Sequence, residues 1–201
     1  MGTDIHLAAE VFRDGKWHLV DIDLPCNRNY RAFAILADVR NGYGFAGMDT
    51  GEPVIPISYP RGFPEDISEE LDKMLLSNDE DDEFWYAEEQ RDPPSDDEEE
   101  IEPIWLGDHS FSWVTLEELL TYDLDAAVTL RGKVPPEAAQ HWEEKHEPPG
   151  NVAAYTSNPD WVTLEWQRPL RESAPLITEL IDALKPLGEP SKVRIVFGFD
   201  S

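Results

Sequence analysis

The sequence has little cysteine, little positive charge and no long apolar run. Cys26 is the single cysteine among 201 residues, so no disulfide can form within the chain and no zinc site can be built from several thiolates. Sparse cysteine is typical of proteins from a reducing cytoplasm. No run of about 18 apolar residues is present, which predicts that the chain does not cross a membrane. The first residues include an acid where a secretory signal has basic residues, so we expect no export signal.

Basic residues are outnumbered: 16 Lys and Arg face 43 Asp and Glu, which gives a formal net charge of −27. Between Glu65 and Glu102 there are 19 acidic residues and two basic ones. A field of this sign repels nucleic acids and anionic membranes, so we expect neither as a direct partner. Residues 77–102 form a low-complexity acidic stretch, predicted to be a flexible insertion in a single domain spanning 1–201. Two interpretations of the acidity stay open: a solubilising segment, or a mimic of a nucleic-acid surface.

The remaining residues predict strands and helices that do not alternate regularly. Apolar runs at 4–12 and 17–24 flank Asp14-Gly15, a pattern typical of a β-hairpin. Thr115 and Glu118 form a capping box that predicts a helix to about Tyr122. The other predicted elements are a helix over 27–40 ended by Asn41-Gly42, a structured loop over 42–65, a helix over 65–76, a helix after Pro135-Pro136, a strand over 161–166, a helix over 174–185 and a strand over 192–199. We therefore predict an α+β fold, with a mainly antiparallel sheet opened by an N-terminal β-hairpin and with packed helices.

Asp4 and His6 stand two residues apart in the first predicted strand, so their side chains should project from one face. If the last strand pairs beside the first, Asp200 comes near them. Carboxylates and imidazoles are suitable ligands for a divalent metal such as Mn, Mg or Zn. The predicted metal ligands are Asp4, His6, His109 and Asp200, with Asp4, His6 and His109 also as catalytic residues. The alternative is that Asp4 and His6 are hydrogen-bonding partners with a structural role.

A second candidate lies in the segment 105–113, where Asp108, His109 and Ser110 are expected in a loop before a capped helix. Such a loop can present backbone N–H groups to an anion, although the same residues are typical of ordinary helix caps. Arginine recognises phosphate with a planar fork of donors. The predicted substrate-binding residues are Arg28, Arg40, Arg61 and Ser110. The alternative for each arginine is that it neutralises neighbouring acids at the surface.

The opening Met1-Gly2-Thr3-Asp4-Ile5-His6, followed by Gly15-Lys16-Trp17, resembles a group of uncharacterised proteins encoded mainly by tailed bacteriophages. Further segments similar to that group follow in the same order: Arg28-Asn29-Tyr30, Pro60-Arg61-Gly62-Phe63-Pro64, His109-Ser110 with Ser112-Trp113, and Val193-Arg194-Ile195-Val196-Phe197 with Phe199-Asp200. The resemblance implies a phage origin, one intact domain and a location in the cytoplasm of the infected bacterium. It implies no particular activity.

Three functions are consistent with these residues. The first is a metal-dependent hydrolase of phosphoesters or nucleotides, in which the acids and imidazoles hold the metal and the arginines hold the phosphate. The second is a protein that sequesters a nucleotide without catalysis. The third is an acidic inhibitor that mimics DNA and blocks a host defence or DNA-binding protein. The expected partner is accordingly a small phosphorylated ligand or a host protein.

Overall fold

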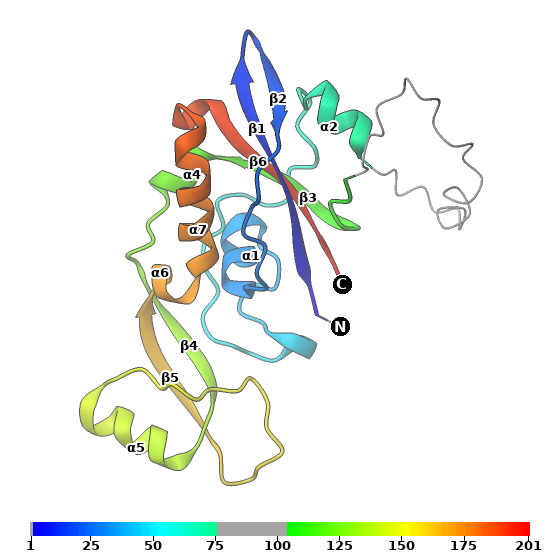
Figure 1. The fold of residues 1–201 in the computed structure, drawn as a ribbon. Coiled ribbons are helices and arrows are strands. Elements are labelled where there is room, and N and C mark those ends of the chain that lie inside the picture. Colours follow the sequence, from blue (N-terminus) through cyan, green and yellow to red (C-terminus); the bar gives the residue numbers. More distant parts are fainter. Residues whose placement is uncertain (1, 76–103) are drawn as a thin grey trace, which may run out of the picture.

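The computed structural model describes residues 2–75 and 104–201, and its centre is a four-stranded antiparallel sheet (Figure 1). The strand order is β2-β1-β6-β3. The strands are β1 (Asp4–Arg13), β2 (Lys16–Val20), β3 (His109–Thr115) and β6 (Val193–Asp200). β1 and β6 pair along their lengths, from Asp4 opposite Asp200 to Val11 opposite Val193, so the two ends of the chain lie side by side. The protein thus has the predicted α+β fold with an N-terminal hairpin.

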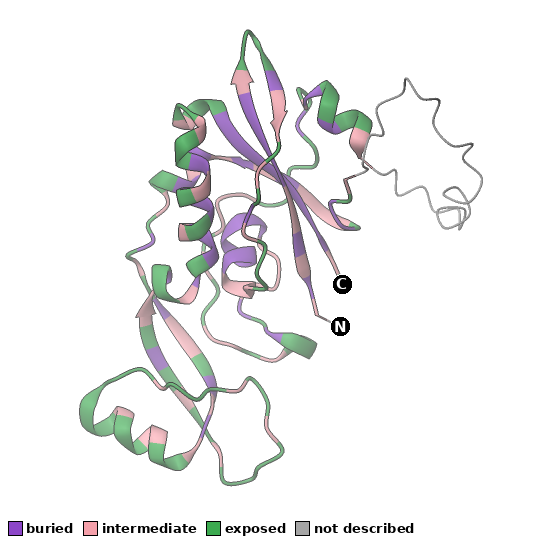
Figure 2. Cartoon of the chain, in the orientation of Figure 1, coloured by how far each residue is buried: buried purple, intermediate pink, exposed green. Residues whose placement is uncertain are grey.

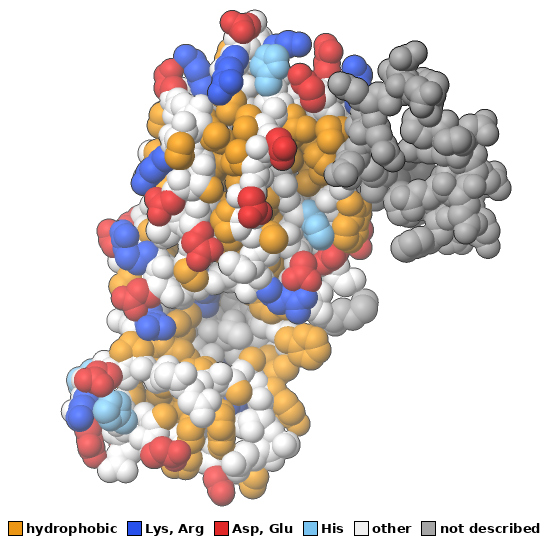
Figure 3. All heavy atoms as spheres, in the orientation of Figure 1, with side chains coloured by type: hydrophobic (Ala, Val, Ile, Leu, Met, Phe, Trp, Pro, Cys, Tyr) orange, Lys and Arg blue, Asp and Glu red, His pale blue; other side chains and the backbone are white. Residues whose placement is uncertain are grey.

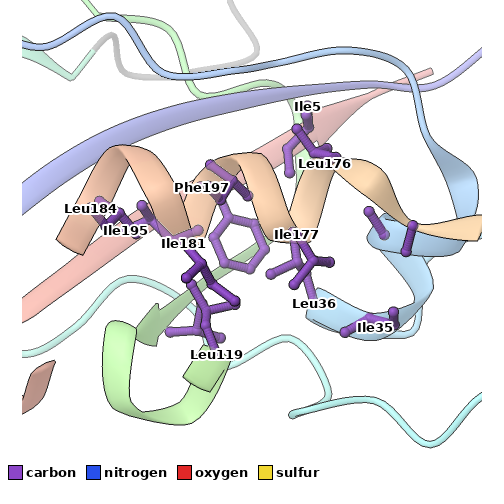
Figure 4. Packing of buried hydrophobic residues seen from close by; sticks show 14 of the residues in the cluster. Ile5, Ile35, Leu36, Leu119, Leu176, Ile177, Ile181, Leu184, Ile195 and Phe197 are labelled. Carbon is purple, nitrogen blue, oxygen red and sulfur yellow. The ribbon is translucent and has the colours of Figure 1, made fainter. Parts of the chain in front are cut away.

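Three helices cover one face of this sheet: α1 (Tyr30–Ala37), α4 (Leu116–Thr121) and α7 (Pro175–Leu184). In α7 the apolar residues recur at helical spacing, so one side of the helix is buried. Figure 4 shows Ile177 and Ile181 of this side directed toward Phe197 of β6, with Leu119 of α4 nearby. This cluster is the main hydrophobic core.

The opposite face of the sheet packs against α2 (Glu69–Met74), whose Leu71 is fully buried. An ion pair lies beneath this helix: Arg194 Nε donates to Glu10 Oε2 at 2.7 Å, and both side chains are buried. Glu10 also accepts the backbone N–H of Ser68 at 2.7 Å, while Arg194 donates to Asp66 Oδ1 at 2.6 Å. These bonds attach the segment before α2 to the two central strands.

A second, two-stranded sheet projects from the main body (Figure 1). Its strands β4 (Ala127–Val134) and β5 (Val162–Pro169) are antiparallel, and α5 (Pro136–Lys145) leads out of β4. Figure 2 shows this region largely exposed, and α5 has no buried residue. The remaining short helices are η1 (Phe45–Gly47), α6 (Leu170–Ser173), η2 (Lys185–Leu187) and η3 (Pro190–Lys192).

The hairpin, the capping-box helix, the helix after Pro135-Pro136, the helix over 174–185 and the closing strand are confirmed. The first helix is shorter than the predicted 27–40. Asn29 caps α1 by accepting the N–H of Ala32 at 2.8 Å, and the helix ends at Asp38 in the left-handed conformation (φ 62°), before Asn41-Gly42. Asp tolerates this conformation better than most residues.

Two further predictions differ from the structure. The helix expected over 65–76 begins only at Glu69, because Ser68 caps it by accepting the N–H of Leu71. The segment from His109 was expected as a loop but forms β3, which pairs with β6. Strand β4 was not predicted. The acidic stretch 77–102 lies outside the described residues.

Candidate functional site

The register of the main sheet separates the predicted metal ligands into two sets. Asp4 lies opposite Asp200, while His6 is two residues further along β1, so these three side chains share one face. His109 lies opposite Phe199, the neighbour of Asp200, and therefore belongs to the other face. The expectation that His109 joins Asp4, His6 and Asp200 is wrong for this reason: side chains alternate along a strand.

On the first face, the acids and the imidazole bind one another. His6 Nε2 lies 3.2 Å from Asp200 Oδ2, and the backbone N–H of Asp4 donates to Asp200 Oδ1 at 3.0 Å. The Asp4 carboxylate is paired with Arg28, whose hydrogen bonds lower the pKa of that carboxyl. The His6 ring packs on Trp105 with ring centroids 4.4 Å apart. Within residues 2–75 and 104–201 no three His, Cys, Asp or Glu side chains are grouped to hold a metal ion.

The second face ends in a surface pocket with a volume of about 400 Å³. This volume lies in the range of roughly 300–1,000 Å³ that is typical of small-molecule sites. The pocket is formed where the start of β1, the turn after α1, the start of β3 and the end of the chain meet. Its lining residues are Thr3, Ala37, Asp38, Val39, Arg40, Pro60, His109, Ser110 and Ser201. Three of the predicted site residues, Arg40, His109 and Ser110, are thus brought together.

A chain of hydrogen bonds runs through the polar residues of this pocket. Arg40 Nε donates to Thr3 Oγ1 at 2.9 Å, and Thr3 Oγ1 lies 3.2 Å from Ser201 Oγ. Ser201 Oγ lies 2.9 Å from Nε2 of His109, and Nδ1 of the same ring lies 2.9 Å from Ser110 Oγ. An arginine, an imidazole and three hydroxyl groups are therefore connected in one network.

Two glycines allow the chain to approach β6 just before His109. Gly107 has φ +86°, and a Cβ atom there would overlap the backbone of Phe199. A Cβ atom on Gly198 would overlap the carbonyl oxygen of Leu106. The close approach lets the N–H of Asp108 donate to the Phe199 carbonyl at 2.8 Å. This bond sets the position at which β3 begins, and with it the place of the His109 ring.

Within the described ranges 2–75 and 104–201, three of the six residues other than glycine that have a positive φ line the pocket. Asp38, Arg40 and Ser110 all have φ between 54° and 62°, and all three line it. The left-handed conformation costs a residue with a Cβ atom roughly 1–2 kcal/mol, and Asp tolerates it better than Arg or Ser. Such strain persists where the surrounding structure imposes it, and it is concentrated at functional sites.

Two of the predicted substrate-binding arginines lie elsewhere. Arg61 donates to both carboxylate oxygens of Glu118, at 2.6 and 3.2 Å, and stacks on the ring of Trp113. Burial of Glu118 raises the pKa of its carboxyl group, whereas the hydrogen bonds from Arg61 and Thr115 lower that pKa by more, so the net shift is downward. Arg28 is paired with Asp4, as described above. Arg28 and Arg61 thus form local ion pairs with acidic side chains, which was the alternative to substrate binding considered from the sequence.

Sequence reasoning missed Thr3 and Ser201, whose hydroxyl groups connect Arg40 to His109. The face that Thr3 occupies could have been predicted, because Thr3 is two residues before the buried Ile5 and side chains two residues apart in a strand share a face. Glu10 and Arg194 were also missed. A charged residue with apolar neighbours on both sides, in each of two strands, is the pattern that could have indicated their pairing.

The fold and the pocket define an α+β protein with a polar pocket at one end of an antiparallel sheet. No protein-family model, curated protein or solved structure matches the chain. No helix within the described ranges 2–75 and 104–201 is long and apolar enough to cross a membrane.

Proposed function

We propose that this chain binds a small phosphorylated molecule by its phosphate group, in the pocket lined by Arg40 and His109. The observation that carries the proposal is the hydrogen-bonded network of one arginine, one imidazole and three hydroxyl groups in a pocket of about 400 Å³. Arginine and hydroxyl groups are common phosphate partners, and an imidazole adds a further donor when it is protonated.

The geometry favours binding over the metal-dependent hydrolysis considered from the sequence. His109 and the pair of His6 with Asp200 belong to opposite faces of the sheet, and the Asp4 carboxylate is paired with Arg28. The net charge of −27 favours a small ligand over a long nucleic acid, because repulsion grows with the number of phosphates. On the resemblance to phage proteins, the proposed setting is the cytoplasm of an infected bacterium.

The pocket also contains a carboxylate, Asp38, which accepts a hydrogen bond from the Asn41 amide at 2.6 Å. This bond holds Asp38 Oδ1 toward Asn41. In our proposal the phosphate lies against Arg40, Ser110 and His109, where the groups that can donate hydrogen bonds are concentrated.

The test is calorimetric titration with inorganic phosphate and with adenosine monophosphate, using the full chain. Arg40→Gln is expected to weaken binding of both at least about tenfold, because hydrogen bonds to a charged group contribute roughly 1.5–3 kcal/mol. Arg61→Gln is the matched control, since Arg61 is paired with Glu118 and does not line the pocket. Its phosphate affinity should equal that of the wild type.

Circular dichroism melting of both variants shows that each is folded at the titration temperature. Absence of phosphate and nucleotide binding at millimolar concentration would refute the proposal. Equal affinity of the wild type and Arg40→Gln would do the same.

A further inference from the structure

We infer that Ser110 is a nucleophile and His109 its general base, so that the pocket cleaves phosphomonoesters through a phosphoserine intermediate; this inference rests on the phosphate binding proposed above. Ser110 Oγ lies 2.9 Å from Nδ1 of His109. This distance is within the reach of roughly 2.6–3.2 Å that nucleophile and base pairs require. Both residues line the pocket that contains Arg40.

The hydrogen-bond network sets the direction of proton transfer. A neutral imidazole carries one proton, on either Nδ1 or Nε2. The Asp108 carboxylate lies 3.9 Å from Nε2 of His109, and its negative charge favours the proton on that nitrogen. Nε2 then donates to Ser201 Oγ, which leaves Nδ1 as the acceptor for the hydroxyl proton of Ser110. Asp108 is thus a positioning residue that acts through His109.

The backbone presents Ser110 in an unusual way. Its φ is +54°, and the pairing of β3 with β6 shifts register between His109 and Ser112. Bulges of this kind redirect a side chain away from the regular alternation of a strand. A strained turn that exposes the serine hydroxyl is also how nucleophiles are presented in unrelated serine hydrolases.

The reaction that follows is balanced by the groups present and by water. Ser110 Oγ attacks the phosphorus atom of the bound ester, the bond from phosphorus to the leaving oxygen breaks, and the Ser110 proton moves to His109 Nδ1. His109 then gives that proton to the leaving alkoxide, which departs as an alcohol. Water next attacks the phosphorus atom of the phosphoserine and gives a proton to His109 Nδ1, and the bond between phosphorus and Ser110 Oγ breaks. His109 passes that proton to Ser110 Oγ, which restores the serine hydroxyl group and the neutral imidazole and releases inorganic phosphate. The guanidinium of Arg40 offsets the charge on the phosphate oxygens.

The test uses a fluorophosphonate, in which attack by a serine oxygen displaces fluoride from phosphorus. Intact-protein and peptide mass spectrometry are expected to find one adduct, at Ser110. The chosen variant is Ser110→Gly, because glycine adopts a positive φ without strain and so should fold at least as well as the wild type. It should abolish the adduct. Ser112→Ala is the matched control: this serine is in the same strand, does not line the pocket, and its loss should leave the adduct at Ser110.

Asp108→Asn tests the positioning role through a split between rate and affinity. We expect the labelling rate to fall about tenfold, equal to about 1.4 kcal/mol, while the dissociation constant for inorganic phosphate is unchanged. A purely structural disturbance would alter both quantities.

The two proposals fail in different ways. No adduct, or an adduct at another serine, together with phosphate binding that depends on Arg40, overturns the nucleophile and leaves the binding function. Loss of the adduct in Ser112→Ala with Ser110 intact also overturns the nucleophile. Absence of phosphate binding in the wild type overturns the proposed function itself.

Discussion

At the scale of single residues, the buried ion pair of Glu10 and Arg194 makes the clearest prediction about stability. The exposed fractions of the two side chains are 0% and 2%. Arg194→Met should therefore reduce the free energy of unfolding by about 3–5 kcal/mol, because it leaves the Glu10 carboxylate buried without a cation. Adding Glu10→Gln should recover much of this loss, since the amide oxygen still accepts the Ser68 N–H. Urea unfolding of the single and double variants measures both effects, and a single-variant loss below about 1 kcal/mol would contradict this account.

Glu118 is the residue whose titration should appear in the pH dependence of stability. Its pKa is lowered in the folded protein, so its contribution is present above the unfolded value of about 4.3 and is lost as the pH falls through the folded value. Glu118→Gln should cost about 1 kcal/mol at pH 7, and its difference from the wild type should shrink below about pH 4. Glu117→Gln, exposed on the same helix, is the control and should show a smaller change. A difference that stays constant from pH 7 to pH 3 would argue against the assignment.

At the scale of secondary-structure elements, Gly15 and Gly107 have nearly equal φ angles but different surroundings. Replacing each by alanine therefore distinguishes the cost of a positive φ from the cost of steric overlap. Gly15, in the β1–β2 turn, has φ +85° with open space at its Cβ position, whereas Gly107 has φ +86° and backs onto Phe199. Gly15→Ala should cost roughly 1–2 kcal/mol of stability and leave phosphate binding unchanged. Gly107→Ala should cost more than that and should also weaken phosphate binding, because the start of β3 must move away from β6. Equal losses in the two variants, measured by urea unfolding and by phosphate titration, would show that the approach of residues 106–108 to β6 is unimportant.

The elements also show why the sequence predicted some parts and not others. The β1–β2 hairpin and the helix capped by Thr115 are determined by neighbours within a few residues, so local patterns were sufficient. β3 was predicted as a loop because Gly107, Asp108 and Ser110 are typical turn residues, and only its pairing with β6 makes it a strand. The same long-range pairing decides which face each side chain occupies.

The partner that each charged residue binds is likewise decided by contacts between residues far apart in the sequence. Arg40 donates to Thr3 in the pocket, Arg28 pairs with Asp4, and Arg61 pairs with Glu118, although nothing in the sequence distinguishes the three arginines. The pairing of β1 with β6, by contrast, was considered only as a condition under which Asp200 would come near Asp4 and His6, and the structure meets that condition. The error concerned the face that His109 occupies: it was assigned to the face of Asp4 and His6, because the register of β3 against β6 could not be known from the sequence.

At the scale of the whole molecule, the net charge of −27 opposes the binding of any anion. On the face drawn in Figure 3, basic side chains lie among acidic ones. Residues 77–102 add 14 acidic residues and one basic residue to the total. The pocket itself is built from other parts of the chain, so this segment should act on phosphate binding through its long-range field.

Deleting residues 77–102 should therefore tighten phosphate binding in a way that depends on salt. The screening length is about 30 Å at 0.01 M ionic strength and about 8 Å at 0.15 M. We expect a gain in affinity of roughly three- to tenfold at 0.01 M salt and no change at 0.15 M, measured by calorimetric titration. A chain in which the acids of 77–102 are replaced by amides keeps the length and should behave like the deletion. Weaker phosphate binding after the deletion would mean that this segment contributes to the phosphate site directly. If residues 77–102 instead mimic a nucleic acid, the deletion should abolish binding of a protein partner while phosphate is still bound.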